Sequence, residues 1–227
     1  MLLTVTPHLN GDLVYLSAEA QPGLPADRAA GDLLARFDNE LRGLDLSLDS
    51  TVRTRLWGRD REARDLGSRE RVKVLSGAAR SASSSFIAPD HFDSAASVAI
   101  DLVALRPSAG TPAKVLVEYD PPIVPLRYLV WGGTAFLSGV TWEHGSLDDQ
   151  LDNILPRIGD SLVAAGSSWA KAVRMSCFLH RSQTIEALRV ALAVRLGDDL
   201  PRAAEFAFVD GYSAPGKLIE IELTGAL

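Results

Sequence analysis

The sequence predicts an α+β fold built from two tandem copies of one unit, each with the element order ββ-α-β-α-ββ. One observation is a repeat, in which similar residues recur in similar settings 121 or 122 positions apart. The pairs that show it are Ser17 with Ser138, Asp101 with Glu222, and Arg80 with Arg202. The other observation is that strand-like and helix-like patterns follow one another in the same order in both halves. Each unit is therefore expected to be a sheet with two helices packed on one face.

The N-terminal unit is expected over residues 1–107. Asn10-Gly11, between two alternating runs, is a strong hairpin signal and makes residues 12–17 the second strand. Apolar residues three or four apart predict an amphipathic helix over 25–44, and a weaker pattern predicts a second helix over 61–77. The remaining alternating segments predict strands over 50–59, 81–88 and 97–105.

Residues 108–125 are rich in proline and predict a linker, and 126–227 repeat the order as the C-terminal unit. The unit opens with a hairpin around Gly132-Gly133. Pro156 lies inside the helical pattern at 147–166, where it is expected to kink the helix or shift its start. The other expected elements are a possible strand within the linker at 114–119, a strand over 170–181, a helix over 182–196, and strands over 203–210 and 217–225.

The composition is that of a soluble globular protein, since 47% of the 227 residues are apolar and 23% are charged. A net charge of −6 argues against nucleic acid, and no run approaches the ~20 apolar residues of a membrane span. The single cysteine, Cys177, excludes an intramolecular disulfide and fits a reducing compartment. The first residues lack the basic start of a signal peptide. We therefore expect a cytoplasmic protein with no nucleic-acid or membrane partner.

Several segments carry a resemblance in their order and spacing. A hairpin ending in Ser138-Gly139 is followed by a helix, a strand, a short helix, Pro201-Arg202 before a strand, and "IEIE" at 219–222. In this order the C-terminal unit resembles the RidA family, also called YjgF/YER057c/UK114. The N-terminal unit resembles it more weakly, through "VYLSAEAQP", "ARSASSSFIA" and "VAIDLVAL". The resemblance implies a chorismate-mutase-like fold and a homo-oligomer with a trimer-like arrangement of units and ligand clefts between neighbours.

The resemblance also implies an activity, the hydrolysis of small carboxylate-bearing imines or enamines to a keto acid and ammonia, without a metal or organic cofactor. At the matching positions, Arg202 and Arg80 are expected to bind the substrate carboxylate, because a guanidinium offers it two parallel hydrogen bonds. Glu222 and Asp101 are expected to be the catalytic carboxylates that position water. The residues that match the small cleft-lining pair are Ser138, Gly139, Ser17 and Ala18.

A second function stays open beside the first: a non-catalytic protein of the same fold that binds a small metabolite or acts as a scaffold. The sequence departs from the family pattern at the cysteine that commonly follows the arginine, where it has Ala204 and Ala82. The resemblance also brings two other activities into consideration, RNA cleavage and chorismate hydrolysis. No residues of this sequence favour either of them. None of the four histidines has a partner at metal-ligand spacing, so no metal site is expected.

Several of these residues also have a purely structural interpretation. Glu220 and Glu222 alternate with isoleucines, as on a strand with one solvated face. The basic run at 53–71 has acidic residues interleaved and is expected to be a solvated edge of a strand and a helix. Cys177 and Trp57 are expected to be core residues of their strands.

Overall fold

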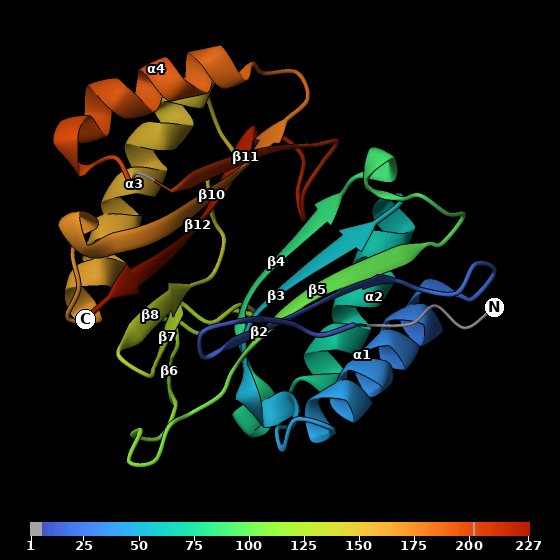
Figure 1. The fold of residues 1–227 in the computed structure, drawn as a ribbon. Coiled ribbons are helices and arrows are strands. Elements are labelled where there is room, and N and C mark those ends of the chain that lie inside the picture. The colour runs from blue at the N-terminus through green and yellow to red at the C-terminus, as the bar shows by residue number, and fades with distance from the viewer. Residues whose placement is uncertain (1–5, 202) are drawn as a thin grey trace.

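The computed structural model of the protein describes residues 6–201 and 203–227. Over these residues the chain forms two sheets and four α-helices, arranged as two units in sequence (Figure 1). This is the doubled α+β architecture that the repeat predicts. Arg202, one of the expected site residues, lies outside the described residues.

The N-terminal unit is a five-stranded sheet in the order β1-β2-β5-β3-β4. β3 and β4 run parallel, and the other neighbours are antiparallel. Two helices, α1 and α2, pack on one face of this sheet and enclose an apolar core with it. The elements are β1 (His8–Asn10), β2 (Leu13–Glu19), α1 (Ala26–Arg42), β3 (Thr51–Gly58), α2 (Arg61–Val74), β4 (Ala82–Ile87) and β5 (Val98–Leu105).

The C-terminal unit repeats this topology, with the order β11-β10-β12-β8-β7-β6 and β9 paired to β12. β10 and β11 are its parallel pair, as β3 and β4 are in the first unit. The elements are β7 (Tyr128–Trp131), β8 (Thr134–Leu137), β9 (Val140–Thr141), α3 (Leu147–Ala164), β10 (Ala172–His180), α4 (Ile185–Leu196), β11 (Ala204–Val209) and β12 (Ile219–Ala226). Short 3-10 turns lie at Leu48–Ser50, Gly77–Ala79, Pro89–His91, Trp169–Lys171 and Gly197–Asp199.

Local sequence signals explain where the helices begin. Ser146 and Asp149 form a capping box at the start of α3, and the Thr184 hydroxyl caps α4 by accepting from Ala187 N. The Asp60 carboxylate caps α2 in the same way. Pro156 does not shift the start of α3, which begins at Leu147 and continues through the proline. Pro156 is exposed, so water can bond the carbonyl that loses its helical partner.

The helices lie on the outer sides of the molecule, and the two sheets turn their other faces toward one another (Figure 1). An aromatic cluster closes one part of this interface, where Phe86 of β4 stacks on Phe178 of β10 at 4.2 Å between ring centroids. A second apolar cluster, which includes Val52 and Phe136, closes another part. The backbones also join at Ile87 and Gly211. The two units therefore share buried surface and have a fixed relative position.

The segment between the units, residues 108–125, contacts both of them. Its strand β6 (Val115–Val117) pairs with β7 and extends the C-terminal sheet. Lys114 beside this strand donates from Nζ to the carbonyl oxygens of Asp49, Thr51 and Arg80 in the N-terminal unit. No helix among the described residues is both long and apolar enough to cross a lipid bilayer.

Candidate functional site

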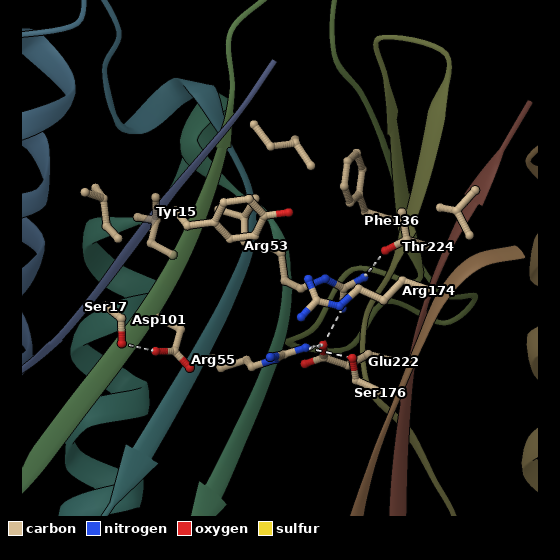
Figure 2. A pocket seen from close by; sticks show the side chains of 15 residues that line it. Tyr15, Ser17, Arg53, Arg55, Asp101, Phe136, Arg174, Ser176, Glu222 and Thr224 are labelled. Atoms are coloured by element: carbon tan, nitrogen blue, oxygen red, sulfur yellow. Dashed lines mark hydrogen bonds and ion pairs between the residues drawn. The ribbon is translucent and has the colours of Figure 1, made fainter. Parts of the chain in front are cut away.

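A cavity of about 300 Å³ lies between the two sheets, and both units line it (Figure 2). Because strand side chains alternate between the two faces of a sheet, most of the lining comes from the faces that the two sheets turn toward one another. The N-terminal wall carries Leu13, Tyr15, Leu16, Ser17, Arg53, Arg55, Asp101, Leu102 and Val103. The C-terminal wall carries Phe136, Val173, Arg174, Ser176, Glu222 and Thr224. We call this space the inter-sheet cavity.

Glu222 is the most completely buried charged group of this cavity, with 1% of its side chain exposed. Two arginines of the opposite unit reach it. Arg55 donates to Glu222 Oε2 from Nε at 3.0 Å and from Nη2 at 2.8 Å. Arg53 Nη1 lies 2.8 Å from the same oxygen, while Arg53 Nη2 donates to the carbonyl oxygen of Leu223 at 2.9 Å. The ion pairs therefore join the two units through one carboxylate oxygen.

The charges of this cluster set its protonation. Burial alone raises the pKa of Glu222, but the nearby charges of Arg53 and Arg55, with hydrogen bonds from Arg55, lower it to about 2. Burial alone lowers the pKa of Arg55, and Glu222 outweighs that effect and raises it. Glu222 is therefore ionised at neutral pH, with a low affinity for a proton.

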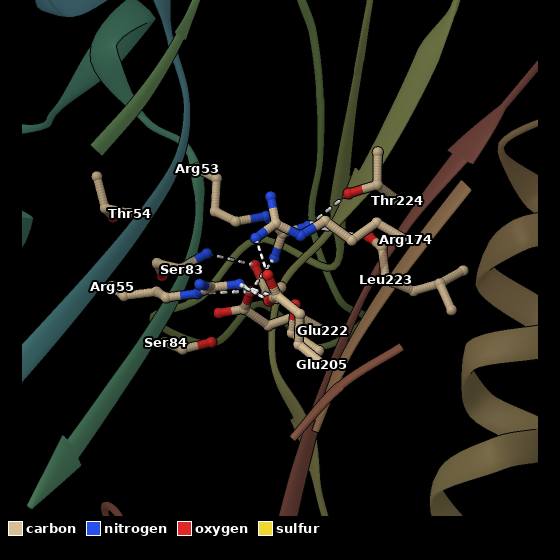
Figure 3. A network of polar contacts seen from close by, with 12 residues as sticks. Arg53, Thr54, Arg55, Ser83, Ser84, Arg174, Glu205, Glu222, Leu223 and Thr224 are labelled. Carbon is tan, nitrogen blue, oxygen red and sulfur yellow. Dashed lines mark hydrogen bonds and ion pairs between the residues drawn. The ribbon is translucent and has the colours of Figure 1, made fainter. Parts of the chain in front are cut away.

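A second carboxylate holds the remaining arginine of the cavity (Figure 3). Glu205 of β11 pairs with Arg174 and accepts a hydrogen bond from the Ser176 hydroxyl at 2.7 Å. Arg55 Nη2 also lies 3.7 Å from Glu205 Oε2. The Arg174 side chain is 36% exposed, which makes it the most accessible of the three arginines of the cavity.

Asp101 stands on the wall opposite Glu222, beside Arg55 (Figure 2). Its Oδ1 accepts from the Ser17 hydroxyl at 2.5 Å, and its Oδ2 accepts from Trp57 Nε1 at 2.8 Å. Strand register places Ser17, Asp101 and Arg55 side by side across β2, β5 and β3. Two neutral donors thus fix the orientation of this carboxylate at the edge of the cavity.

Ser138 and Gly139 lie outside the cavity, at the seam where β4 meets the C-terminal unit. The Ser138 hydroxyl accepts from Ser83 N at 3.1 Å, and Gly139 N donates to the Ser83 carbonyl at 3.3 Å. A Cβ at position 139 would overlap Glu220 Oε1 and lie 2.5 Å from Ser84 Oγ, so only glycine fits. Ser138 through its hydroxyl and Gly139 through its amide therefore join the two units at the backbone of Ser83.

Glu220 is the buried carboxyl group of this seam. Burial raises its pKa to about 7, and the negative charge of nearby Glu222 contributes to the rise. The alternative interpretation of a solvated strand face fails for both glutamates, because the N-terminal sheet covers the face of β12 from which they project. A single unit has that face open, and the doubled fold buries it.

Arg80 is occupied by a carboxylate of the protein itself. Its guanidinium forms a two-pronged pair with Glu118 of the connecting segment, in which Nη2 donates to Oε2 at 3.0 Å and Nη1 pairs with Oε1. This is the fork geometry expected for a bound substrate acid. Arg80 and Asp101 do not come together in the inter-sheet cavity, whereas Ser17, Asp101 and Glu222 all line it.

The arginines of the cavity were not expected as site residues. The run that contains Arg53 and Arg55 is predicted to be solvated, but 7% and 15% of these side chains are exposed. The prediction is wrong because their face of β3 is covered by the other unit. One signal was present: Arg53 lies 121 positions before Arg174, so the repeat places both on the inner face of corresponding strands.

Cys177 and Trp57 are core residues, as predicted. Cys177 is 1% exposed, and burial raises the pKa of its thiol to about 12. Such a thiol stays protonated and unreactive at neutral pH.

Comparison with solved structures identifies the fold. The chain is similar to chorismatase over its whole length, with a TM-score of 0.70 and 18% identity, and it covers 78% of that chain. A YjgF/YER057c/UK114 family member from Mycobacterium tuberculosis matches 50% of this chain and 99% of its own, at 23% identity and a TM-score of 0.44. A Rid-family protein from Yersinia pestis matches 51% of this chain and 100% of its own, at 19% identity and a TM-score of 0.46.

The chain matches no protein-family model and no curated protein. The prediction of a chorismate-mutase-like α+β fold with two units in tandem is confirmed by the repeated topology and by the full-length match to chorismatase. At these identities the matches define the fold. The chemistry has to be argued from the side chains of the site.

Proposed function

We propose that the protein binds a small carboxylate-bearing metabolite in the inter-sheet cavity and hydrolyses the imine or enamine form of that metabolite. The observation that carries this proposal is the pairing of arginines with a separate, oriented carboxylate inside one enclosed space. Arg174 supplies the positive end from the C-terminal wall, with Arg53 from the N-terminal wall, and Asp101 lies on the wall that faces Arg174. Such a cavity with a few convergent polar groups is the usual form of a small-ligand site.

Arg174 is the arginine best placed to bind a carboxylate. Glu222 already takes hydrogen bonds from Arg55 and the charge of Arg53. Arg174 pairs only with Glu205 among the described residues, and it keeps about a third of its side chain open. A ligand acid can share the Arg174 fork or displace Glu205, which is 47% exposed and can turn to water. The cavity thus offers one adaptable cation beside two fixed ones.

Asp101 is the residue proposed to orient the water that hydrolyses the imine. Water adds to the carbon of the C=N bond, the C–N bond then breaks, and ammonia and a keto acid leave. A carboxylate that orients the water, takes its proton and returns that proton to the leaving nitrogen contributes on the order of 10²–10⁴-fold to such a step. Ser17 and Trp57 hold the Asp101 carboxylate in one orientation, which this role needs. No cofactor enters the proposal.

A second candidate function is binding without turnover, and one observation favours it. Glu222, the carboxylate that the sequence places in the catalytic role, has a pKa of about 2 and is held by two arginines. A carboxylate of that kind is a weak base at neutral pH. If Asp101 does not activate water, the cavity acts as a receptor for the acid.

One assay separates these functions. 2-Iminopropionate is generated in situ from alanine by an amino-acid oxidase, and ammonia and pyruvate are followed with the wild type and with Asp101→Asn and Arg174→Ala. We expect Asp101→Asn to lower kcat about 10²- to 10⁴-fold with little change in KM. Arg174→Ala is expected mainly to raise KM. Arg106→Ala, an exposed arginine outside the cavity, is the matched control.

Pyruvate binding that Arg174→Ala abolishes, without turnover by the wild type, would favour the receptor. Absence of binding would end both proposals. Arg202 stays a predicted carboxylate ligand, and Arg202→Ala in the same assay tests it. Self-association of the chain is a further prediction, and light scattering coupled to size-exclusion chromatography tests it.

A further inference from the structure

The inter-sheet cavity is larger than a three-carbon acid requires. 2-Iminopropionate has six non-hydrogen atoms, which fill at most about 180 Å³ even at the ~30 Å³ that a whole water molecule occupies in the liquid. The cavity holds about 300 Å³, within the range of sites that take ligands of drug size. A small acid held by Arg174 would therefore leave much of the space to water.

The walls of the remaining space are apolar. Tyr15 and Val103 contribute from the N-terminal sheet, and Phe136 and Val173 contribute from the C-terminal sheet. In Figure 2 the rings of Tyr15 and Phe136 lie on opposite sides of the part of the cavity that is away from Asp101. Val173 is 52% exposed and stands on the open side of the cavity. Water makes few hydrogen bonds to such walls, whereas an apolar group that replaces it removes apolar surface from water, which is favourable.

Strand register joins this apolar region to the arginines. On the N-terminal sheet, Tyr15, Val103 and Arg53 stand in one row across β2, β5 and β3. Each wall therefore has an arginine two strands away from an aromatic residue, about 10 Å along the row. The matching row on the C-terminal sheet is Phe136, Thr224 and Arg174, across β8, β12 and β10.

From this arrangement we infer that the metabolite is an acid with an aromatic side chain, whose carboxylate bonds to Arg174 while its ring lies between Tyr15 and Phe136. This inference rests on the proposed use of the cavity for an organic acid, and it names the substrate class. A two-strand separation matches the length of a 2-imino or 2-keto acid that carries a phenyl group on carbon 3. 2-Iminopropionate ends at carbon 3 and has no ring to place between Tyr15 and Phe136.

The test compares phenylpyruvate with pyruvate by isothermal titration calorimetry, with ligand-observed NMR for weak binding. We expect phenylpyruvate to bind at least about tenfold more tightly to the wild type, since a buried ring brings most of the apolar area. Tyr15→Ala should remove most of that preference and leave pyruvate affinity nearly unchanged. Tyr15→Phe, which keeps the ring, is the matched control and should retain the preference. Thermal unfolding of each variant checks that it folds.

A second variant tests the same space by filling it. Val103→Phe fills the apolar region and should weaken phenylpyruvate binding about tenfold while pyruvate still binds. Equal affinities of the two acids for the wild type, or a preference that Tyr15→Ala leaves intact, would overturn the aromatic ligand. Phenylpyruvate binding with the expected preference but no hydrolysis of its imine would support the ligand class and sink the hydrolase. Failure of both acids to bind would overturn the inference together with the site.

Discussion

Asp101 and Glu222 occupy corresponding positions of the two units, yet their surroundings are of opposite kinds. Asp101 accepts hydrogen bonds from two neutral groups of its own unit, Ser17 and Trp57. Glu222 is paired with two arginines that come from the other unit, Arg53 and Arg55. The repeat thus determines where a carboxylate stands, and the side chains facing it determine its charge environment. One position can serve chemistry in one unit and cohesion in the other.

The edge strands β4 and β11 show the same divergence. Phe86 of β4 is fully buried against Phe178, whereas the corresponding position of β11 holds Ala207, and the neighbouring Phe208 is 38% exposed. To the cluster between the units β4 contributes this large ring, whereas β11 contributes the smaller Ala207 and Val209. The four predictions below test how far the two units have diverged, and the largest expected effect comes first.

Replacing Phe86 by alanine should cost about 3–5 kcal/mol of the free energy of unfolding, because it opens a cavity in the interface between the units. Phe208→Ala, which removes the phenylalanine of β11, should cost less than about 1 kcal/mol, since that ring is partly exposed already. Urea unfolding of both variants gives the comparison. Similar losses at the two positions would mean that β11 is covered in solution, for example by a second copy of the chain.

The pH dependence of stability should show opposite contributions from two glutamates. The folded pKa of Glu222, about 2, lies below its ordinary value of 4.5, so its stabilisation exists above pH 4.5 and is lost as the pH falls toward 2. The folded pKa of Glu220, about 7, lies above 4.5, so stability is lost as the pH rises from 4.5 to 7. Each contribution amounts to about 3 kcal/mol.

Urea unfolding between pH 2 and pH 8 measures the free energy of unfolding on both sides of pH 4.5. Glu220→Gln should remove the loss of stability between pH 4.5 and pH 7, which we call the upper limb. The N-terminal unit has Ala99 where the C-terminal unit has Glu220, so the upper limb is specific to the C-terminal unit. An unchanged profile in Glu220→Gln would assign the effect to another group.

Gly139→Ala should destabilise the protein by about 1–3 kcal/mol, because the added Cβ overlaps the Glu220 carboxyl group. The N-terminal unit carries the pair Ala18 and Ala99 at the positions of Gly139 and Glu220. The double variant Gly139→Ala/Glu220→Ala should therefore lose less free energy of unfolding than the two single variants lose together. A double-mutant cycle measures this coupling, and additive losses would argue against a shared space.

The smallest expected effect is at Glu118. Its pair with Arg80 is partly exposed, so Glu118→Gln should change stability by less than about 1 kcal/mol. The same change frees a guanidinium fork, and acetate binding measured by NMR titration should increase. Glu118→Gln/Arg80→Gln is the control that should lose the gain. Unaltered acetate binding in Glu118→Gln would show that Arg80 has no room for a second acid.

The sequence allowed the fold to be predicted because its signals are local and occur twice. Hairpins at Asn10-Gly11 and Gly132-Gly133, helical periodicities and the 121-residue spacing each need only neighbouring residues or a simple comparison. Ser17, Asp101 and Glu222 were also found in this way, since each belongs to a repeated pair.

The remainder depends on contacts between the units. Arg53 and Arg55 alternate with Val52, Thr54 and Leu56, and this pattern is the same whether water or another sheet covers the face that carries the arginines. Glu118, which holds Arg80, comes from the connecting segment, where nothing in the sequence indicates a partner. The physical reason is that docking two sheets face to face leaves no signature in either strand pattern.

The joining of both walls in one polypeptide has a genetic consequence. In a ring of identical subunits, one mutation changes the same position in every subunit. A substitution that improves one wall of a binding site therefore also alters the other wall wherever that position lines both. Here a codon for tyrosine at position 15 leaves position 136 untouched. Selection can therefore shape an asymmetric chamber one side at a time, and it can fit a molecule whose two ends differ.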